Sequence, residues 1–271
     1  MRIICPIDLG EASLNAINFA ANIIQKTNGF LTLLHLEPGL PAMETEDFAT
    51  DEMLQTKAAA IAQIENICEE TEKSFGISCD ALVRKAEMDD IVKIATKKEY
   101  DLLVMGTDGT SGLGDYLFGS NTSNIMEDCD IPILSVPSDY YDTVQKHIVF
   151  ASEHKKGEKA SIMQLVGYAQ HVGARVTVLH VAHGSIVEDV NLIKDFRASI
   201  SKQFGTSVDV KFKQVKGSGV EEALKEYIRK KDVDLLAMLT YHHNFFYNLF
   251  HESLSKKMTL LAQLPIMVFH Q

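Results

Sequence analysis

Long apolar runs are missing from this chain of 271 residues. No stretch of about 18 consecutive apolar residues occurs, so we expect no transmembrane helix. The residues after Met1 do not form a basic segment followed by a long apolar one, which predicts that no signal peptide is present and that the protein is cytoplasmic. Hydrophobic residues make up 46% of the chain and charged residues 23%, a composition that favours a packed core over disorder.

Cysteine is scarce and basic residues are few in the first half of the chain. The four cysteines all precede residue 130 and form no C-x-x-C pair, which predicts reduced and mostly buried thiols. Residues 1–138 hold 9 basic and 23 acidic residues, a net charge of −14, whereas residues 139–271 hold 17 and 14, a net charge of +3. An acidic first half argues against nucleic acid as a partner. Any phosphate ligand must therefore be held by local N–H groups or by a metal.

The two commonest nucleotide motifs are also absent. No lysine lies between Lys98 and Lys146, which excludes a Walker loop there, and the spacing G-x-G-x-x-G does not occur. The chain has instead a strand-like run, Leu102–Met105, followed by the spacing G-x2-G-x9-G-S, a helix-like stretch and a second strand-like run at Ile131–Val136. The motif residues are Gly106, Gly109, Gly119 and Ser120. Glycines before a helix N-terminus are typical of a phosphate site, because backbone and helix dipole can approach an anion there.

Strand and helix patterns alternate along the first half. We expect strands at Arg2–Ile7, Phe30–Leu36 and Ser78–Lys85, and helices at Glu11–Asn28, roughly Thr50–Ser74 and Asp89–Lys98. Gly29 is predicted to close the first helix. This alternation predicts right-handed βαβ units and a parallel sheet covered on both faces.

The second half repeats the first. Lys146–Ala151, Gly173–Val181, Val233–Leu239 and Leu264–Phe269 match the strand patterns of the first half at an internal period of about 133–145 residues, which indicates a duplicated domain. We therefore predict a domain at 1–138, a linker at 139–143 and a second domain at 144–271.

The glycine motif, between a strand that ends in VMG and the segment IPILSVP, resembles the nucleotide-binding branch of the universal stress protein family. With the repeat, the resemblance covers essentially the whole chain as a tandem. It implies an α/β fold of two tandem flavodoxin-like (adenine nucleotide alpha hydrolase-like) domains, each a five-stranded parallel sheet with helices on both faces. It also implies a stress-response or regulatory protein that binds ATP, AMP or a related adenine nucleotide in the N-terminal domain.

The resemblance further implies a set of nucleotide-binding residues. Asp8 matches the acidic residue at the adenosine end, with Pro6 beside it, and the backbone of Leu36 is expected to meet the adenine. The loop from Met105 onward is expected to hold the phosphates and ribose through Gly106, Thr107, Gly109, Gly119, Ser120 and Asn121. Asp108 would repel phosphates unless Mg²⁺ or Mn²⁺ lies between them. Each residue has a simpler explanation as well: Asp8 could cap a helix, Leu36 could belong to the core, and the glycines could shape a turn.

The second half differs where the ligand would lie. Leu239, His242 and Glu252 stand where the first half has Gly106, Gly109 and Gly119, although Ser253 matches Ser120. Ala151-Ser152-Glu153 replaces Pro6-Ile7-Asp8. We therefore predict that the second domain has lost the site and serves as a built-in dimer partner.

Histidines suggest a metal site only weakly. His242, His243 and His251 fall in the altered loop, but adjacent histidines cannot easily face one ion, so we expect surface or aromatic-packed side chains and no metal site. His35 and His180 share a strand position and are expected to be structural.

No acid–base pair accompanies the serines and threonines of the loop, so we predict no catalytic residue. Two alternatives stay open: a slow metal-dependent ATPase, and an interaction module that does not need a nucleotide.

The final strands of the two halves predict how the halves are assembled. Ile131–Val136 and Pro265–Phe269 are short, apolar and free of lysine, and an open strand edge must be paired or covered. We expect them to associate within one chain as a pseudo-two-fold pair, which leaves a further homodimer open.

Overall fold

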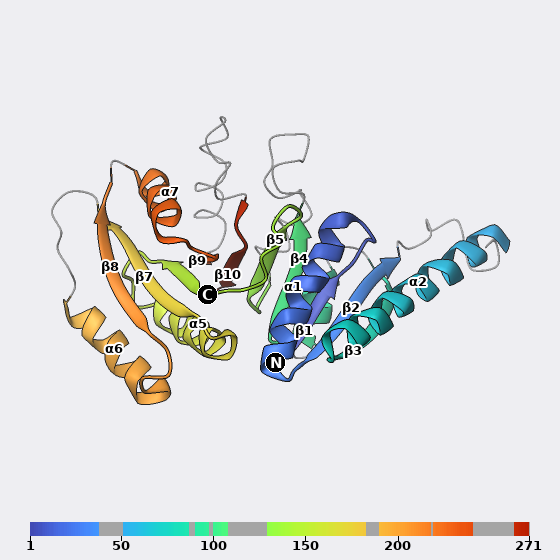
Figure 1. Ribbon diagram of the computed structural model, residues 1–271, viewed down its shortest axis with the longest axis horizontal. Coiled ribbons are helices and arrows are strands. Elements are labelled where there is room, and N and C mark those ends of the chain that lie inside the picture. Colours follow the sequence, from blue (N-terminus) through green and yellow to red (C-terminus); the bar gives the residue numbers. More distant parts are fainter. Residues whose placement is uncertain are drawn as a thin grey trace.

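The ten strands in the part of the chain that the structure describes belong to one continuous sheet. The computed structural model describes residues 1–37, 51–86, 90–97, 100–107, 129–182, 190–217, 219–240 and 263–270. The strand order is β3-β2-β1-β4-β5-β10-β9-β6-β7-β8, so each half contributes five neighbouring strands (Figure 1).

The elements alternate in the order that the sequence predicts. The first half contains β1 (Arg2–Pro6), α1 (Glu11–Thr27), β2 (Phe30–Glu37), α2 (Asp51–Phe75), β3 (Ser78–Lys85), α3 (Asp90–Lys97), β4 (Leu102–Thr107) and β5 (Ile133–Pro137). The second half contains β6 (His147–Ala151), α5 (Glu158–Val172), β7 (Arg175–Ala182), α6 (Val190–Phe204), β8 (Val210–Lys216), α7 (Val220–Lys231), β9 (Leu235–Thr240) and β10 (Ile266–His270). The domain boundaries themselves stay a prediction.

Within each half the strands are parallel, and the α/β class with helices on both faces is confirmed. The order 3-2-1-4-5 in the first half differs from the order 2-1-3-4-5 that defines flavodoxin itself. It places the reversal of strand order between β1 and β4. Ligands of open parallel sheets bind outside the carboxyl ends of the strands at such a reversal, so the fold directs attention to the ends of β1 and β4.

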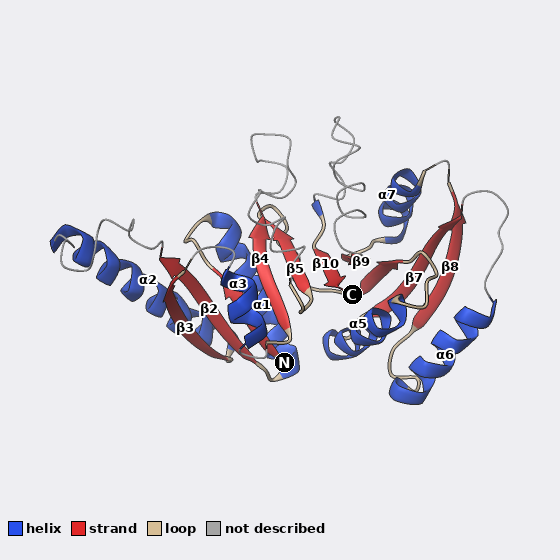
Figure 2. Ribbon diagram, turned by 180° about the vertical axis from the view of Figure 1, so that it is seen from behind, coloured by secondary structure: helices blue, strands red, loops and turns tan. Residues whose placement is uncertain are grey.

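The helices form two layers. α1, α2, α5 and α6 pack on one face through one apolar cluster, and α3 and α7 pack on the other face through a second cluster (Figure 2). Each cluster includes residues from both halves, so the core does not stop at the boundary between them. No helix within the described ranges combines the length and the apolar character that a membrane span requires. Three cysteines, Cys5, Cys68 and Cys129, are buried and Cys79 is half-buried, as predicted.

The end of α1 corrects one prediction. Asn28, not Gly29, takes the left-handed conformation (φ 48°) that ends the helix, and its N–H donates to the carbonyl of Ile24. Asparagine tolerates this conformation better than most residues. Gly29 is required for a different reason, since a Cβ there would lie 2.1 Å from the carbonyl oxygen of Met1.

The two halves meet at an antiparallel pair of strands. β5 and β10 pair through Leu134 and Met267, with Ser135 opposite Ile266 and Ile133 opposite Val268. Leu134 and Met267 occupy equivalent positions in the repeat, so the pseudo-two-fold axis passes between them. The structure therefore contains the strand pairing that the sequence predicts; that this pairing holds the halves together in solution stays a prediction.

Asn15 binds the segment that leads from β5 to the second half. Its side chain on α1 is buried, and its Nδ2 donates to the carbonyls of Pro137 and Tyr140, each at 2.8 Å. One amide thus attaches α1 both to the end of β5 and to the chain that leaves it.

We expect Asn15→Ala to lower the free energy of unfolding by about 1–3 kcal/mol, because two carbonyls lose their donor in a buried place. Urea denaturation followed by circular dichroism measures the change. Asn22→Ala is the matched control on the same helix, where the amide bonds to Asn18 at the surface, and it should change stability by less than about 0.5 kcal/mol. Equal effects of the two substitutions would contradict this role of Asn15.

Candidate functional site

The loop between β1 and α1 is held in one conformation at the point where the strand order reverses. The N–H of Ile7 donates to the carbonyl of Leu34 at 2.8 Å, and Nδ1 of His35 lies 3.0 Å from the carbonyl oxygen of Ile7. Leu9 adopts a left-handed conformation with φ 66°, which is unusual for a residue with a branched side chain. Such strain occurs often at binding sites, where the surrounding structure imposes it.

Asp8 presents an ionised carboxylate in this loop. Burial raises the pKa of Asp8, but the Gly10 N–H that donates to its carboxylate, the neighbouring Ser13 hydroxyl and nearby His35 together outweigh burial and leave the pKa below its ordinary value. The Gly10 N–H lies 2.9 Å from Oδ1. Gly10 is the N-cap residue of α1, whose first turn has no side-chain cap. Asp8 therefore shapes the loop before the helix and can still accept hydrogen bonds from a ligand.

The structure brings several predicted residues to one edge of the sheet. Pro6 ends β1, and the registers of β2 and β4 against β1 place Leu36 and Met105 at or near the same level. Leu36 is half-buried, whereas Met105 and Thr107 are buried. Gly109, Gly119, Ser120 and Asn121, together with Asp108, lie outside the described residues. The described residues thus include the predicted adenosine end and the first residues of the loop, Gly106 and Thr107; that they form a nucleotide site stays a prediction.

Gly106 has a packing role that the sequence does not reveal. A Cβ at this position would lie 2.2 Å from the carbonyl oxygen of Ala12 and 2.8 Å from the backbone nitrogen of Ser13. The space that the missing side chain leaves is thus filled by the first turn of α1. Gly106 lets α1 begin directly against β4, whether or not a phosphate binds beside it.

The second half solves the same contact differently. Leu239 stands in place of Gly106 and is buried, whereas the residue equivalent to Ala12 is Gly157, the N-cap of α5. α5 begins two residues later in the repeat than α1. The first half thus has a glycine on the strand, Gly106, whereas the second half has a glycine at the start of the helix, Gly157.

Glu158 occupies the region at the start of α5. Its carboxylate is 1% exposed, accepts the Ser152 hydroxyl at 2.5 Å, and accepts the N–H groups of Glu153 at 2.7 Å and Lys155 at 3.4 Å. Burial raises the pKa of Glu158, and these hydrogen bonds only partly offset the effect. In the second half, an internal carboxylate therefore accepts hydrogen bonds from the amides of the loop that corresponds to the Asp8 loop.

A cavity of about 260 Å³ remains beside this carboxylate. It lies at the carboxyl ends of β6 and β7, and its lining includes Ala151, Glu153, His180 and Leu224. Nδ1 of His180 is 2.8 Å from the carbonyl oxygen of Ser152, which repeats the contact of His35 with Ile7. Each imidazole therefore contacts the loop that follows the first strand of its own half, in agreement with the predicted structural role.

Sequence reasoning missed Leu9, Ser13 and Glu158. The repeat carries a signal for two of them, because Glu158 aligns with Ser13 and a carboxylate replaces a hydroxyl in the first turn of the helix. No pattern marks Leu9, although His154 at the equivalent position is also left-handed, with φ 57°.

Within the described ranges, no three His, Cys, Asp or Glu side chains come together in a way that could hold a metal ion. The histidines at 242, 243 and 251 lie outside those ranges.

Comparison with known proteins agrees with this geometry. The fold is that of a tandem of two α/β domains: a universal stress protein from Archaeoglobus fulgidus superposes with a TM-score of 0.73 at 15% identity, covering 99% of this chain and 98% of that one. A model of the universal stress protein family matches residues 1–137. A universal stress protein from Methanocaldococcus jannaschii is 26% identical over 141 residues, which cover 50% of this chain and 81% of that protein. The chain belongs to the universal stress protein family.

We expect Gly106→Ala to lower the free energy of unfolding by about 1–3 kcal/mol, since the methyl group would overlap the backbone of α1. Gly167→Ala, on α5, is the control: its Cβ would meet Phe204 at an ordinary 3.6 Å, so helix propensity should leave the protein equally stable or more stable by up to about 1 kcal/mol. Thermal unfolding without any nucleotide measures both. If Gly106→Ala were as stable as the wild type, the close contact with α1 would be wrong.

Proposed function

We propose that the N-terminal half binds one adenine nucleotide, ATP or AMP, at the carboxyl ends of β1, β2 and β4, and that the protein acts in stress response or regulation. The observation that carries the proposal is the position of the Asp8 carboxylate, which the Gly10 N–H holds in the loop after β1, at the reversal of strand order. A carboxylate that accepts hydrogen bonds is suited to the hydroxyl groups of a ribose. The glycine motif from Gly106 to Ser120 is proposed to bind the phosphates of the nucleotide through its backbone N–H groups.

The second half is proposed to bind no nucleotide phosphate. Glu158 already bonds the loop amides there, and Glu153 adds a second carboxylate in the same loop. The predicted phosphate end differs as well, because Leu239, His242 and Glu252 stand where the first half has Gly106, Gly109 and Gly119. The second half would then serve to cover the edge of the first.

Mass spectrometry of the small molecules released on denaturation identifies a nucleotide that copurifies with the protein. Calorimetric titration with ATP and with AMP, each with and without Mg²⁺, should return one site per chain. Two equal sites per chain would overturn the assignment to one half, and the absence of any binding would favour the nucleotide-independent interaction module.

The pseudo-symmetry of the chain offers a matched pair of variants. Asp8→Asn should weaken nucleotide binding about tenfold or more, because charge-assisted hydrogen bonds to the ribose would be lost. Glu153→Gln changes the equivalent residue of the second half and should leave the affinity unaltered. Titration of both variants checks this, and an equal loss in both would place the nucleotide elsewhere.

A further inference from the structure

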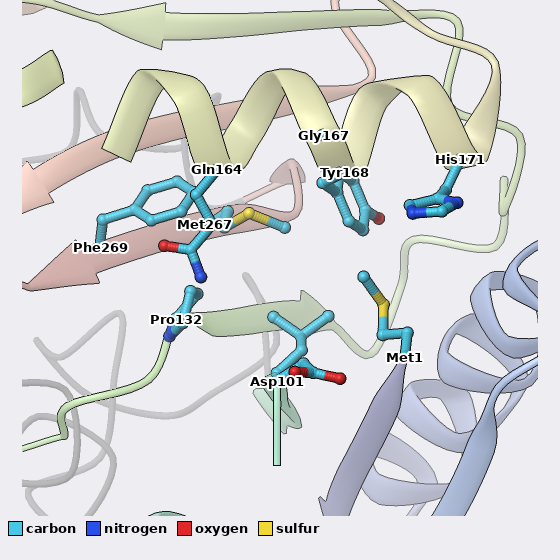
Figure 3. Close-up of a pocket in the computed structure, with 10 residues that line it drawn as sticks. Met1, Asp101, Pro132, Gln164, Gly167, Tyr168, His171, Met267 and Phe269 are labelled. Atoms are coloured by element: carbon cyan, nitrogen blue, oxygen red, sulfur yellow. The ribbon is translucent and has the colours of Figure 1, made fainter. Parts of the chain in front are cut away.

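A cavity of about 310 Å³ lies where the two halves meet. One wall is the face of α5 that carries Gln164, Gly167, Tyr168 and His171, and the opposite wall includes Asp101 and Pro132 of the first half (Figure 3). Figure 3 shows the Gln164 amide directed toward Pro132 and the His171 ring on the side of Met1. Asp101 and Pro132 directly precede β4 and β5. The cavity is therefore at the amino ends of these strands, whereas the proposed nucleotide site is at the carboxyl end of β4.

The pseudo-two-fold axis gives this cavity a counterpart. Because the axis passes between Leu134 and Met267, α5 and Asp101 correspond to α1 and Asp234 on the other side. Gln164 corresponds to Phe19 of α1. The counterpart slot thus lies between Phe19 and the residue before β9.

In that slot the structure contains an aromatic ring, the side chain of Tyr140. The ring centroid of Tyr140 lies 6.3 Å from that of Phe19 at an interplanar angle of 53°. The hydroxyl of Tyr140 donates to the carbonyl oxygen of Asp234 at 3.2 Å. Tyr140 therefore reaches from α1 of the first half to Asp234 of the second half. The cavity lies between the corresponding elements, α5 and Asp101.

The chain path places Tyr140 in this slot. Tyr140 is the third residue after β5, and the side chain of Asn15 donates to its backbone carbonyl at 2.8 Å. Burial, and then the charges of Asp234 and Asp142, raise the pKa of Tyr140, so its hydroxyl stays a donor at neutral pH. The lining of the cavity beneath α5 combines apolar side chains, among them Met267 and Phe269, with polar ones, among them Gln164 and His171.

We propose that this cavity binds a small phenol, a single aromatic ring whose hydroxyl donates to the carbonyl of Asp101. The ring would lie against α5 as the ring of Tyr140 lies against α1. Aromatic rings with one polar group suit a site with an apolar body and a polar end. The site is separate from the proposed nucleotide site and does not depend on it.

The probe for the test is p-cresol, which is the tyrosine side chain without its backbone. Titration of the full-length protein should show saturable binding at one site per chain, with NMR shifts confined to His171, Met267 and their neighbours. Toluene, which lacks the hydroxyl, should bind at least several-fold more weakly. The absence of saturable binding, equal binding of toluene, or shifts at Ala151 and Leu179 in the cavity of the second half would overturn the proposal.

Two substitutions on α5 make the test specific. Gln164→Phe copies Phe19 and should tighten the binding of p-cresol about two- to tenfold through contact between rings. Gln170→Phe, at another exposed position of the same helix, should leave the affinity unchanged. If both substitutions act alike, the cavity is not the site.

A third variant is the positive control. Tyr140→Gly empties the counterpart slot, so the number of p-cresol sites should rise from one to two per chain, and p-cresol should restore part of the lost thermal stability. If p-cresol binds this variant but not the wild type, then the slot accepts phenols and the cavity does not, and the proposal is wrong.

Discussion

The pairing of β5 with β10 is the interaction on which the rest of the structure depends. Each half alone would end its sheet at an apolar strand whose N–H and C=O groups face outward, and such an edge invites association with other chains. Joined in antiparallel fashion at Leu134 and Met267, the two edges satisfy each other, and ten strands share two continuous apolar clusters. This β5–β10 seam therefore buries the open edges of both halves at once.

The pseudo-two-fold symmetry about the β5–β10 seam is broken at three places, where the two halves have different side chains. At the contact between strand and helix, Gly106 admits α1, whereas Leu239 faces a helix that begins later. At the first loop, Asp8 stays available to a ligand, whereas Glu158 bonds the loop amides itself. At the seam, Tyr140 fills one slot and leaves the other as a cavity. The two halves thus share one fold but differ in the side chains at these three places.

The sequence predicts the elements, their order and the repeat, because apolar periodicity and turn residues are local signals. The resemblance to the family further implies that Asp8 and Leu36 serve one site, and the register of β1 and β2 places both at the same edge of the sheet. The sequence does not predict the role of Gly106, because that role depends on where α1 begins. The sequence also does not show that Asn28 rather than Gly29 ends α1, because both residue types tolerate a left-handed backbone. The cavity beneath α5 has no local pattern, since its walls come from elements that lie far apart in the sequence.

The most direct test of this account is the oligomeric state of residues 1–138 expressed alone. The fragment has an exposed β5, and its own copy can offer the same edge in the antiparallel register that β10 provides. Analytical ultracentrifugation of the folded fragment should show homodimers whose fraction rises with concentration, while the full chain shows no such association through β5. A folded fragment that stays monomeric at high concentration would contradict the central role of the β5–β10 pairing.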